Sequence, residues 1–370
     1  MRKTVAVFFG GKSCENEISV LTGVFVMHLL DGEKYRLLPV YVHTNGLAYT
    51  SPKLKDLDFF KEKRFAEAER IFFDGGNAYV FVKEKKVKLL GKVDVALNCC
   101  HGGLGEGGGV SAMMEWNGIP FASPDLTSSG VFMDKGTTKL FMKSLGIPTV
   151  DYIRVNEKDY EKRGAFLLKS IESRLKYPVV IKPSHLGSSI GISVARNEVE
   201  TKAALEKGFA LDDRVIVEKF LEEKRDVNCA AYLREGEICV SEPEEAFGSG
   251  IYSFEEKYVK RSQDGVKGGG RVAITGELRE KIRSYTRTVY KRMDLKGVVR
   301  MDFLVSGKQV YLCEVNTVPG SLAYYLFCER ITDAKRFFTD LVEEGFKNGA
   351  GSTKKTISTG ILQSVRWNRK

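Results

Sequence analysis

Four polar side chains in the last third of the chain form a pattern suited to metal and phosphate chemistry. They lie on the stretches VVRMDFLV and CEVNTVPG and are Arg300, Asp302, Glu314 and Asn316. Residues two apart on a strand point to the same face. If the stretches form an antiparallel hairpin with Asp302 opposite Glu314, then Arg300 is opposite Asn316 and the loop is Gly307 to Gln309. Three-residue hairpin loops are common, and this one predicts a single face that bears all four side chains.

The chemistry of this face is that of a divalent cation bound beside a nucleotide. Two carboxylates and an amide oxygen are hard ligands that suit Mg²⁺, which also takes phosphate oxygens. Arg300 beside them can neutralise a transferring phosphoryl group or a developing oxyanion. The alternative is an exposed polar hairpin, but the apolar residues Leu304, Tyr311 and Cys313 on the same strands disfavour it. We therefore predict a metal site formed by the two carboxylates and the amide.

A second group of candidates lies in VVIKPSHLGSSIGI (179–192), which the pattern predicts to be a strand followed by a Gly- and Ser-rich loop. Lys182 lies at the end of the strand. Gly187, Ser188 and Ser189 offer backbone N–H groups and hydroxyls to phosphates, and the alternative is a flexible turn. Downstream, VIVEKFL (215–221) is an apolar strand that is equally compatible with binding an adenine edge and with a structural salt bridge.

Two common nucleotide motifs are excluded. The stretch AVFFGGKS (6–13) matches a permissive P-loop pattern, but Val7, Phe8 and Phe9 continue a buried strand, so no backbone cradle forms there. The GxGxxG pattern of a dinucleotide site is absent, and the second strand ends at His43 rather than at an acid.

Length and composition are those of a globular protein with two or three compact units. The chain has 370 residues, of which 43% are hydrophobic and 29% charged. The net charge of +10 would suit a polyanion, but acidic residues interleave with the lysines, which disfavours a nucleic-acid-binding protein without catalysis. The first apolar run, Val5 to Phe9, is too short for a signal peptide, and no run reaches the ~20 apolar residues of a membrane span. Seven cysteines without a CxxC pair indicate a reducing cytoplasm.

Strand and helix patterns position these candidates. TVAVFFGG, SCENEISVLTGVFVMHLL and YRLLPVYVHTNG predict a β-α-β unit with parallel strands, and FFDGGNAYVFV predicts a hairpin that turns at Gly75-Gly76. The strand VDVALNCC then enters HGGLGEGGG, where His101 is better placed for a ligand than a core histidine would be. Two Gly-rich strand-to-helix turns indicate a ligand site at the carboxyl ends of these strands. Residues 227–245 alternate like antiparallel sheet, and 263–271 read as a loop.

The order of the motifs resembles one family. HGGLGEGGG, MDK, VVIKPSHLGSS, VIVEKF, FEEKYV, VVRMDF and CEVNTVPG follow one another as in the D-alanine–D-alanine ligases, which are ATP-grasp enzymes. GGKSCENEIS near the start fits this group too, and the resemblance covers about residues 3–345. It implies an α/β fold, α+β in the C-terminal part: an ATP-grasp fold preceded by an N-terminal parallel-sheet domain.

The resemblance also implies how the chain is divided. We expect an N-terminal pre-ATP-grasp α/β domain at 1–133, a central ATP-grasp subdomain at 134–225, a C-terminal ATP-grasp subdomain with the metal site at 226–349, and a basic tail at 350–370. Ligases of this kind are cytoplasmic and often homodimeric, and we expect the same here. We expect no nucleic-acid or membrane partner.

The implied activity is ATP-dependent ligation of a carboxylate to an amine. ATP phosphorylates the carboxylate of one D-alanine, and the amine of a second attacks the acylphosphate to give D-alanyl-D-alanine, ADP and phosphate for peptidoglycan precursors. ATP and two Mg²⁺ ions, or Mn²⁺ in their place, are the implied cofactors. The alternative is a ligase of the same mechanism that takes D-serine, D-lactate or another acceptor.

Each candidate residue has an implied role. The ATP-binding set is Lys135, Lys182, Gly187, Ser188, Ser189, Glu218, Lys219, Phe220, Leu221, Asp226 and Lys257. The metal set is Asp302, Glu314 and Asn316. The substrate-binding set is Glu15, His101, Tyr258 and Tyr325, and the catalytic set is Glu15, Ser188, Arg300 and Gly320. Glu15 is expected to hold the first amino group, and Lys257 and Tyr258 to belong to a lid that excludes water.

Three positions depart from the family pattern. Asp226 stands where a ribose-binding Glu is usual, and Gly107 stands where an Asp usually follows Gly-Glu. Tyr325 stands where a Ser usually lies near the carboxylate of the second substrate. A phenol differs from a serine hydroxyl in volume and in hydrogen bonding, so Tyr325 is the departure that bears on the identity of the acceptor.

Overall fold

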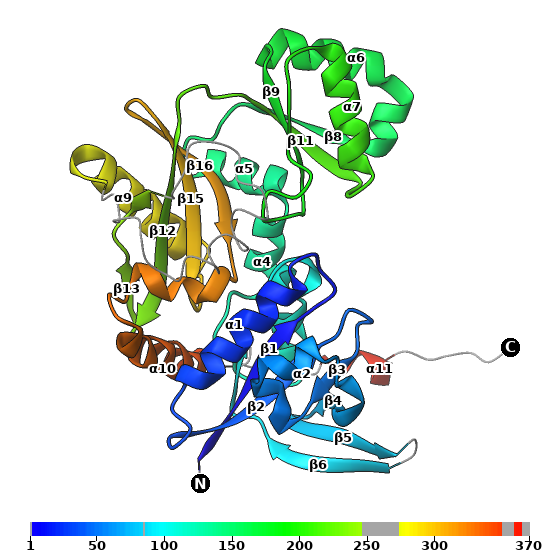
Figure 1. The fold of residues 1–370 in the computed structure, drawn as a ribbon, viewed down its shortest axis with the longest axis vertical. Coiled ribbons are helices and arrows are strands. Elements are labelled where there is room, and N and C mark those ends of the chain that lie inside the picture. Colours follow the sequence, from blue (N-terminus) through cyan, green and yellow to red (C-terminus); the bar gives the residue numbers. More distant parts are fainter. Residues whose placement is uncertain (1, 84–85, 246–273, 350–358, 365–370) are drawn as a thin grey trace, which may run out of the picture.

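The computed structural model describes residues 2–83, 86–245, 274–349 and 359–364. Three β-sheets follow one another along the long axis of the molecule, and helices pack on each of them (Figure 1). Lys257, Tyr258 and the predicted loop 263–271 lie outside the described residues.

The first sheet has the strand order β6-β5-β4-β3-β2-β1-β7. Its strands are β1 (Lys3–Gly10), β2 (Tyr35–Val42), β3 (Ala48–Thr50), β4 (Glu69–Asp74), β5 (Asn77–Lys83), β6 (Lys86–Lys92) and β7 (Val95–Asn98). β1 pairs in parallel with β2 and β7, as the β-α-β pattern predicts, and the other neighbours are antiparallel. Val7, Phe8 and Phe9 are fully buried in β1, which confirms that no P-loop forms there. β4 and β5 turn at Gly75-Gly76, as predicted.

Helices connect and cover this sheet. The longest, α1 (Asn16–Leu29), links β1 to β2 and packs closely because Gly23 faces Phe9; a Cβ at Gly23 would lie 2.5 Å from the Phe9 side chain. The shorter helices are η1 (Pro52–Lys55), α2 (Leu57–Lys61), η2 (Phe65–Glu67), η3 (Gly105–Gly109), α3 (Val110–Trp116) and α4 (Leu126–Met133). Gly105, Gly107 and Gly109 lie in η3, which continues into α3 although Gly108 has a φ of 103°. This helix therefore begins earlier than the sequence pattern suggests.

The second sheet is antiparallel, with the strand order β10-β9-β11-β8. Its strands are β8 (Tyr152–Asn156), β9 (Val179–Pro183), β10 (Ser193–Ala195) and β11 (Arg214–Lys219), and its helices are α6 (Glu157–Leu175) and α7 (Glu198–Phe209). The helices and strands enclose a hydrophobic cluster of their own. The loop that follows β9 is the predicted phosphate loop.

The third sheet has the strand order β13-β12-β15-β16, with β14 beside β12. Its strands are β12 (Arg225–Arg234), β13 (Glu237–Val240), β14 (Glu244–Glu245), β15 (Val299–Ser306) and β16 (Gln309–Asn316). Helix α9 (Gly276–Arg292) buries Ile282, Val289 and Tyr290 in the cluster under this sheet. Helix α5 (Lys135–Ser144) packs against β16. Asp134 caps α5 because its carboxylate accepts the Thr137 N–H at 2.6 Å.

The helix α10 (Ile331–Asn348) joins the first and third sheets. It contacts β7 of the first and β12 of the third, and η4 (Gly320–Leu326) leads into it from β16 (Figure 1). Phe337 and Phe338 of α10 belong to the same hydrophobic cluster as Val5 and Phe9 of β1. The core under the first sheet is therefore completed by residues more than 300 positions away.

The last described element is the short helix α11 (Ile361–Ser364). None of the described helices combines the length and the apolar character needed to cross a membrane. The predicted division of the chain after residues 133, 225 and 349 stays a prediction.

Candidate active site

The β15–β16 hairpin brings the four predicted polar residues onto one face. Asp302 lies opposite Glu314, and Arg300 lies opposite Asn316, as expected. Arg300 donates two hydrogen bonds to Asp302, from Nε to Oδ1 at 2.7 Å and from Nη2 to Oδ2 at 2.9 Å. Asn316 Nδ2 donates to the same Oδ2 at 3.0 Å. These contacts hold the Asp302 carboxylate in one orientation.

The predicted three-residue loop is wrong, although the pairing that it was meant to produce is right. The turn has only two residues, because Ser306 pairs with Gln309. A β-bulge at Cys313 then shifts the register by one residue, so Glu314 still comes opposite Asp302.

The oxygen donors of this face suit a divalent cation. Asp302 and Glu314 offer carboxylates from adjacent strands, and Asn316 offers an amide, which is a donor set for Mg²⁺. Lys135, the first residue of α5, places its Nζ 3.4 Å from Glu314 Oε1. The Glu314 side chain is 29% exposed. A carboxylate that is paired with a lysine and partly open to solvent can accept a cation without rearrangement of the fold.

A buried charged cluster adjoins this face. Glu218 at the end of β11 accepts a hydrogen bond from Lys182 Nζ at 2.6 Å and lies 3.0 Å from Lys139 Nζ. Lys139 comes from α5 and also donates to the Val150 carbonyl at 3.3 Å. Burial works against the charge of Glu218, but the two lysines outweigh it and lower the pKa of Glu218 to about 2. Cys313, the bulged residue, lies 3.8 Å from Lys182 Nζ. The cluster thus connects β9 and β11 to α5 and β16.

The loop after β9 meets the loop after β1. The Ser188 hydroxyl donates a hydrogen bond to the Glu15 carboxylate, although the two residues are 173 positions apart. Ser188 and Ser189 have φ angles of 52° and 60°, in the left-handed region, so the loop turns sharply here. Gly102 and Gly187 flank the Glu15 carboxylate so closely that a Cβ on either would lie within 2.9 Å of it. Three loops from distant parts of the sequence therefore converge on Glu15.

His101 is buried, and both its ring nitrogens contact protein groups. Nε2 lies 2.8 Å from Thr22 Oγ1, and Nδ1 lies 2.7 Å from the Val318 carbonyl. Burial lowers the pKa of His101 to about 4, so the ring is neutral and its Nδ1–H donates to the carbonyl. Ser321 N–H donates to the same Thr22 oxygen at 3.2 Å, so this histidine links α1 to the segment after β16. The predicted contact of His101 with substrate stays a prediction.

Glu106, a partly buried carboxylate, lies next to Glu15. It accepts hydrogen bonds from the backbone N–H groups of Gly102 at 2.7 Å and Val318 at 3.3 Å. Burial and, after it, the charge of Glu15 raise the pKa of Glu106 to about 7. Two neighbouring carboxylates make this part of the site acidic, which suits an ammonium group.

Tyr325 contacts the guanidinium that Asp302 orients. Arg300 Nη1 donates to the phenol oxygen at 3.2 Å. Tyr325 lies on η4, where three successive residues from Ser321 share a φ of 51°. A run of left-handed residues other than glycine is costly, and such strain is often kept at functional sites. Gly320, the predicted backbone donor, begins this segment.

The remaining predicted ATP-binding residues lie where β11 ends and β12 begins. They are Glu218 and Lys219, which end β11, Phe220 and Leu221, which follow it, and Asp226 in β12. Asp226 accepts a hydrogen bond from Lys224 Nζ at 2.5 Å. Their contacts with adenine and ribose stay predictions.

The sequence patterns did not identify four residues of this region, which are Glu106, Lys139, His185 and Asn228. Asn228 lies opposite Asp302 across β12–β15 and so shares its face. It is two positions from Asp226, so the strand alternation contained a signal for it. Lys139 and His185 offer no such signal, because their charged partners are remote in the sequence.

Comparison with known proteins extends over nearly the whole chain. The family models described as D-ala D-ala ligase N-terminus and D-ala D-ala ligase C-terminus match residues 4–124 and 141–345. The D-alanine–D-alanine ligase of Thermosipho africanus is 34% identical over 330 residues, which cover 87% of this chain and 88% of that protein. That of Thermosipho melanesiensis is 32% identical over 97% of this chain and 98% of its own length. The solved D-alanine–D-alanine ligase of Helicobacter pylori superposes with a TM-score of 0.74 at 25% identity, over 94% of this chain and 98% of its own. These likenesses confirm the predicted ATP-grasp fold.

Proposed function

Because this chain belongs to the D-alanine–D-alanine ligase family, we propose that it joins two molecules of D-alanine into D-alanyl-D-alanine while ATP is converted to ADP and phosphate. The dipeptide would serve as a peptidoglycan precursor. The observation that carries the proposal is the convergence of three loops on Glu15, with the metal-type donors on β15 and β16 linked to one of these loops through Lys135.

The two steps make different demands on the site. In the first, a carboxylate oxygen of one D-alanine attacks the γ-phosphorus of ATP, the bond to the β,γ-bridging oxygen breaks and ADP leaves. In the second, the amine of the other D-alanine attacks the carbonyl carbon of the acylphosphate, the amide bond forms and phosphate leaves. The first step needs positive charge around phosphates, and the second needs donors at the developing oxyanion.

The residues present meet these demands in two groups. Glu15, oriented by Ser188 and with Glu106 beside it, provides negative charge for the ammonium of the first D-alanine. Arg300, fixed by Asp302, and the backbone N–H of Gly320 are the proposed donors to the tetrahedral intermediate.

The phosphate side is proposed to include Lys135, Lys182 and the loop from Gly187 to Ser189. Asp302, Glu314 and Asn316 would hold two Mg²⁺ ions, or Mn²⁺, which when bound neutralise phosphate charge and orient the reacting oxygens. Lys135 reaches both Glu314 and the Leu186 carbonyl, so it sets the distance between the metal-type donors and the phosphate loop. Tyr325 beside Arg300 is the side chain that we expect the second D-alanine to meet.

The test is ADP release by the purified protein with Mg-ATP, with products identified by mass. D-alanine alone should stimulate ADP release strongly and yield D-alanyl-D-alanine, whereas L-alanine should not. D-serine alone and D-alanine plus D-lactate are the comparison reactions. No ADP release with D-alanine, but ADP release with another pair of substrates, would overturn the acceptor assignment. It would indicate that Tyr325 selects a different acceptor.

We also propose that the enzyme works in the cytoplasm as a homodimer. The described cysteines form no disulfide with one another, which fits a reducing compartment. Light scattering on the purified protein tests the dimer, and a mass of one chain, 41.4 kDa, would contradict it.

A further inference from the structure

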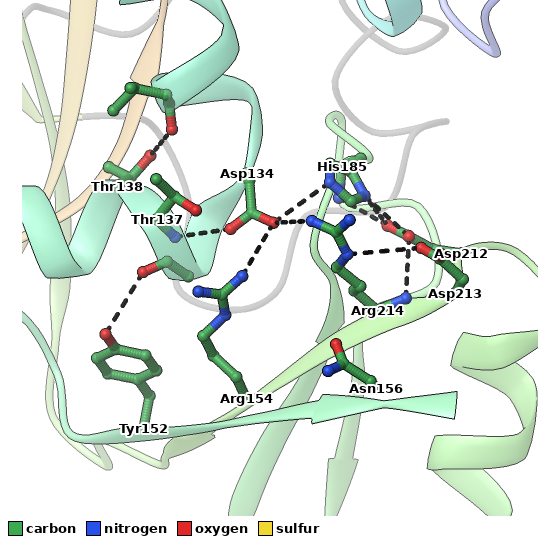
Figure 2. A network of polar contacts seen from close by, with 12 residues as sticks. Asp134, Thr137, Thr138, Tyr152, Arg154, Asn156, His185, Asp212, Asp213 and Arg214 are labelled. Atoms are coloured by element: carbon green, nitrogen blue, oxygen red, sulfur yellow. Dashed lines mark hydrogen bonds and ion pairs between the residues drawn. The ribbon is translucent and has the colours of Figure 1, made fainter. Parts of the chain in front are cut away.

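A histidine at the start of the phosphate loop lies between two aspartates. His185 Nδ1 is 2.9 Å from Asp212 Oδ1, and His185 Nε2 is 3.3 Å from Asp134 Oδ2 (Figure 2). The His185 backbone N–H also donates to Asp212 Oδ2 at 2.7 Å. Asp134 caps α5, and Asp212 lies just before β11, so the ring connects two elements that are separate in the sequence.

Both ring contacts require the charged form of the histidine. A neutral imidazole has a single N–H, whereas here each nitrogen faces a carboxylate oxygen that can only accept. The two hydrogen bonds, first that to Asp134 and then that to Asp212, raise the pKa of His185 to about 9 against the effect of burial. The ring therefore carries a proton at neutral pH.

The charges of the His185 ring and of the groups around it sum to zero only when the ring is protonated. Asp134 on the α5 cap, Asp212 and Asp213 before β11 supply three carboxylates. Arg154 on β8 and Arg214 on β11 supply two guanidiniums, which lie 3.4 and 3.2 Å from Asp134 Oδ2 (Figure 2). Loss of the histidine proton would leave one carboxylate in excess and remove one of the two donors.

His185 and its two partners, Asp134 and Asp212, form what we call the His185 clamp. This clamp holds the residues that lead into the phosphate loop. The Ser184 carbonyl accepts the Lys135 N–H at 3.1 Å, and the Leu186 carbonyl accepts Lys135 Nζ at 2.5 Å. His185 lies between these two residues, so three successive residues are tied to α5 or to the start of β11. Ser188 follows after Gly187 and contacts Glu15.

We infer that His185, as an imidazolium, is a positioning residue that ties the phosphate loop to α5 and thereby fixes Ser188 and Lys135 at the spacing that nucleotide phosphates need. This rests on the proposed role of the loop in ATP binding. The α5 cap itself does not depend on His185, because Asp134 accepts the Thr137 N–H through its other oxygen and keeps both arginines. Replacing His185 should therefore disturb the loop more than the fold.

The test compares three variants in direct binding of Mg-ATP by calorimetry, without D-alanine, whose own amine titrates at high pH. H185Q removes the charge and one donor, H185R keeps the charge and several donors, and H28Q changes an exposed histidine on α1 as a control. We expect about a tenfold weaker ATP affinity for H185Q, an affinity within about threefold of wild type for H185R, and no change for H28Q.

Two further readouts separate positioning from a merely structural role. The ATP affinity of the wild type should fall between about pH 8 and pH 10 as the imidazolium titrates, and H185R should not show this fall. In turnover, H185Q should raise KM for ATP by more than it raises KM for D-alanine. Unchanged ATP affinity in H185Q, or the same pH dependence in H185R, would overturn the inference. A wild type that does not bind ATP would instead refute the proposed function.

Discussion

Arg300 donates to Asp302 through Nε and Nη2 and to Tyr325 through Nη1. The other carboxylate of this face, that of Glu314, pairs with Lys135 and not with Arg300. A carboxylate paired with a lysine can exchange that partner for a cation, whereas one gripped by a bidentate guanidinium is held more tightly. Glu314 is thus the residue at which metal dependence should be most evident.

We predict that Glu314→Gln lowers turnover on the order of a hundredfold or more, because the neutral amide is a poorer ligand for Mg²⁺. Its thermal unfolding should stay close to that of the wild type, since the side chain is partly exposed. Glu206→Gln, at an exposed position on α7, is the matched control. Near-normal Mg²⁺-dependent ADP release by Glu314→Gln would refute the metal assignment.

Glu106 gives a prediction about pH. Its folded-state pKa of about 7 exceeds the ordinary value of 4.5, so the folded protein binds this proton more tightly and loses stability as the pH rises through this window. Gln cannot ionise, so Glu106→Gln should gain stability relative to the wild type by up to about 3 kcal/mol between about pH 5 and pH 8.

Urea unfolding of the nucleotide-free protein at both ends of this pH range measures the effect. The free energy of unfolding of Glu115→Gln, at an exposed position on α3, should change with pH as that of the wild type does. If the free energy of unfolding of Glu106→Gln shows the same pH dependence as that of the wild type, the Glu106 carboxyl group does not have the raised pKa.

At the scale of elements, α5 is held to the second sheet by a buried ion cluster. Lys139 is 1% exposed and pairs with Glu218, whose other oxygen binds Lys182. Breaking a buried ion pair costs about 3–5 kcal/mol, and the loss here should lie at the lower end because Glu218 keeps its pair with Lys182.

Lys139→Met should therefore destabilise the protein by about 3 kcal/mol in chemical unfolding, and Lys143→Met, at an exposed position on the same helix, should have little effect. The double variant Lys139→Met/Glu218→Gln should lose more than Lys139→Met alone, because Lys182 then loses the buried carboxylate that it binds. A loss for Lys139→Met no larger than that for Lys143→Met would contradict this role.

At the scale of the whole molecule, the sheets differ in how far their cores are self-contained. The second sheet and its two helices bury a cluster drawn only from residues 153–217, whereas the core under β1 includes residues of η4 and α10. A domain folds alone only if its own residues complete its core.

We expect a fragment spanning 148–222 to unfold cooperatively when followed by circular dichroism. A fragment spanning 1–133 should lack a cooperative transition, because α10 is missing from its core. Adding a chain that supplies η4 and α10 is the control for the second fragment. Cooperative unfolding of 1–133 alone would show that α10 is dispensable for this core.

Some of this site could be predicted from the sequence by itself because the relation is local. Asp302 and Arg300, like Glu314 and Asn316, share a face through the two-residue period of a strand, and β1 could be excluded as a P-loop from its apolar run. The motif order likewise gave the fold and the family, since those motifs lie in a fixed sequence order.

Only the tertiary structure decided relations between residues remote in the chain or dependent on a local irregularity. The Ser188–Glu15 contact, the burial of His101, the Lys139–Glu218 pair and the His185 clamp each depend on how loops meet in space. The hairpin shows the limit most clearly. The pairing of Asp302 with Glu314 was predicted, but its cause was a bulge at Cys313 rather than a longer turn, because residue types alone do not reveal where a strand accommodates an extra residue.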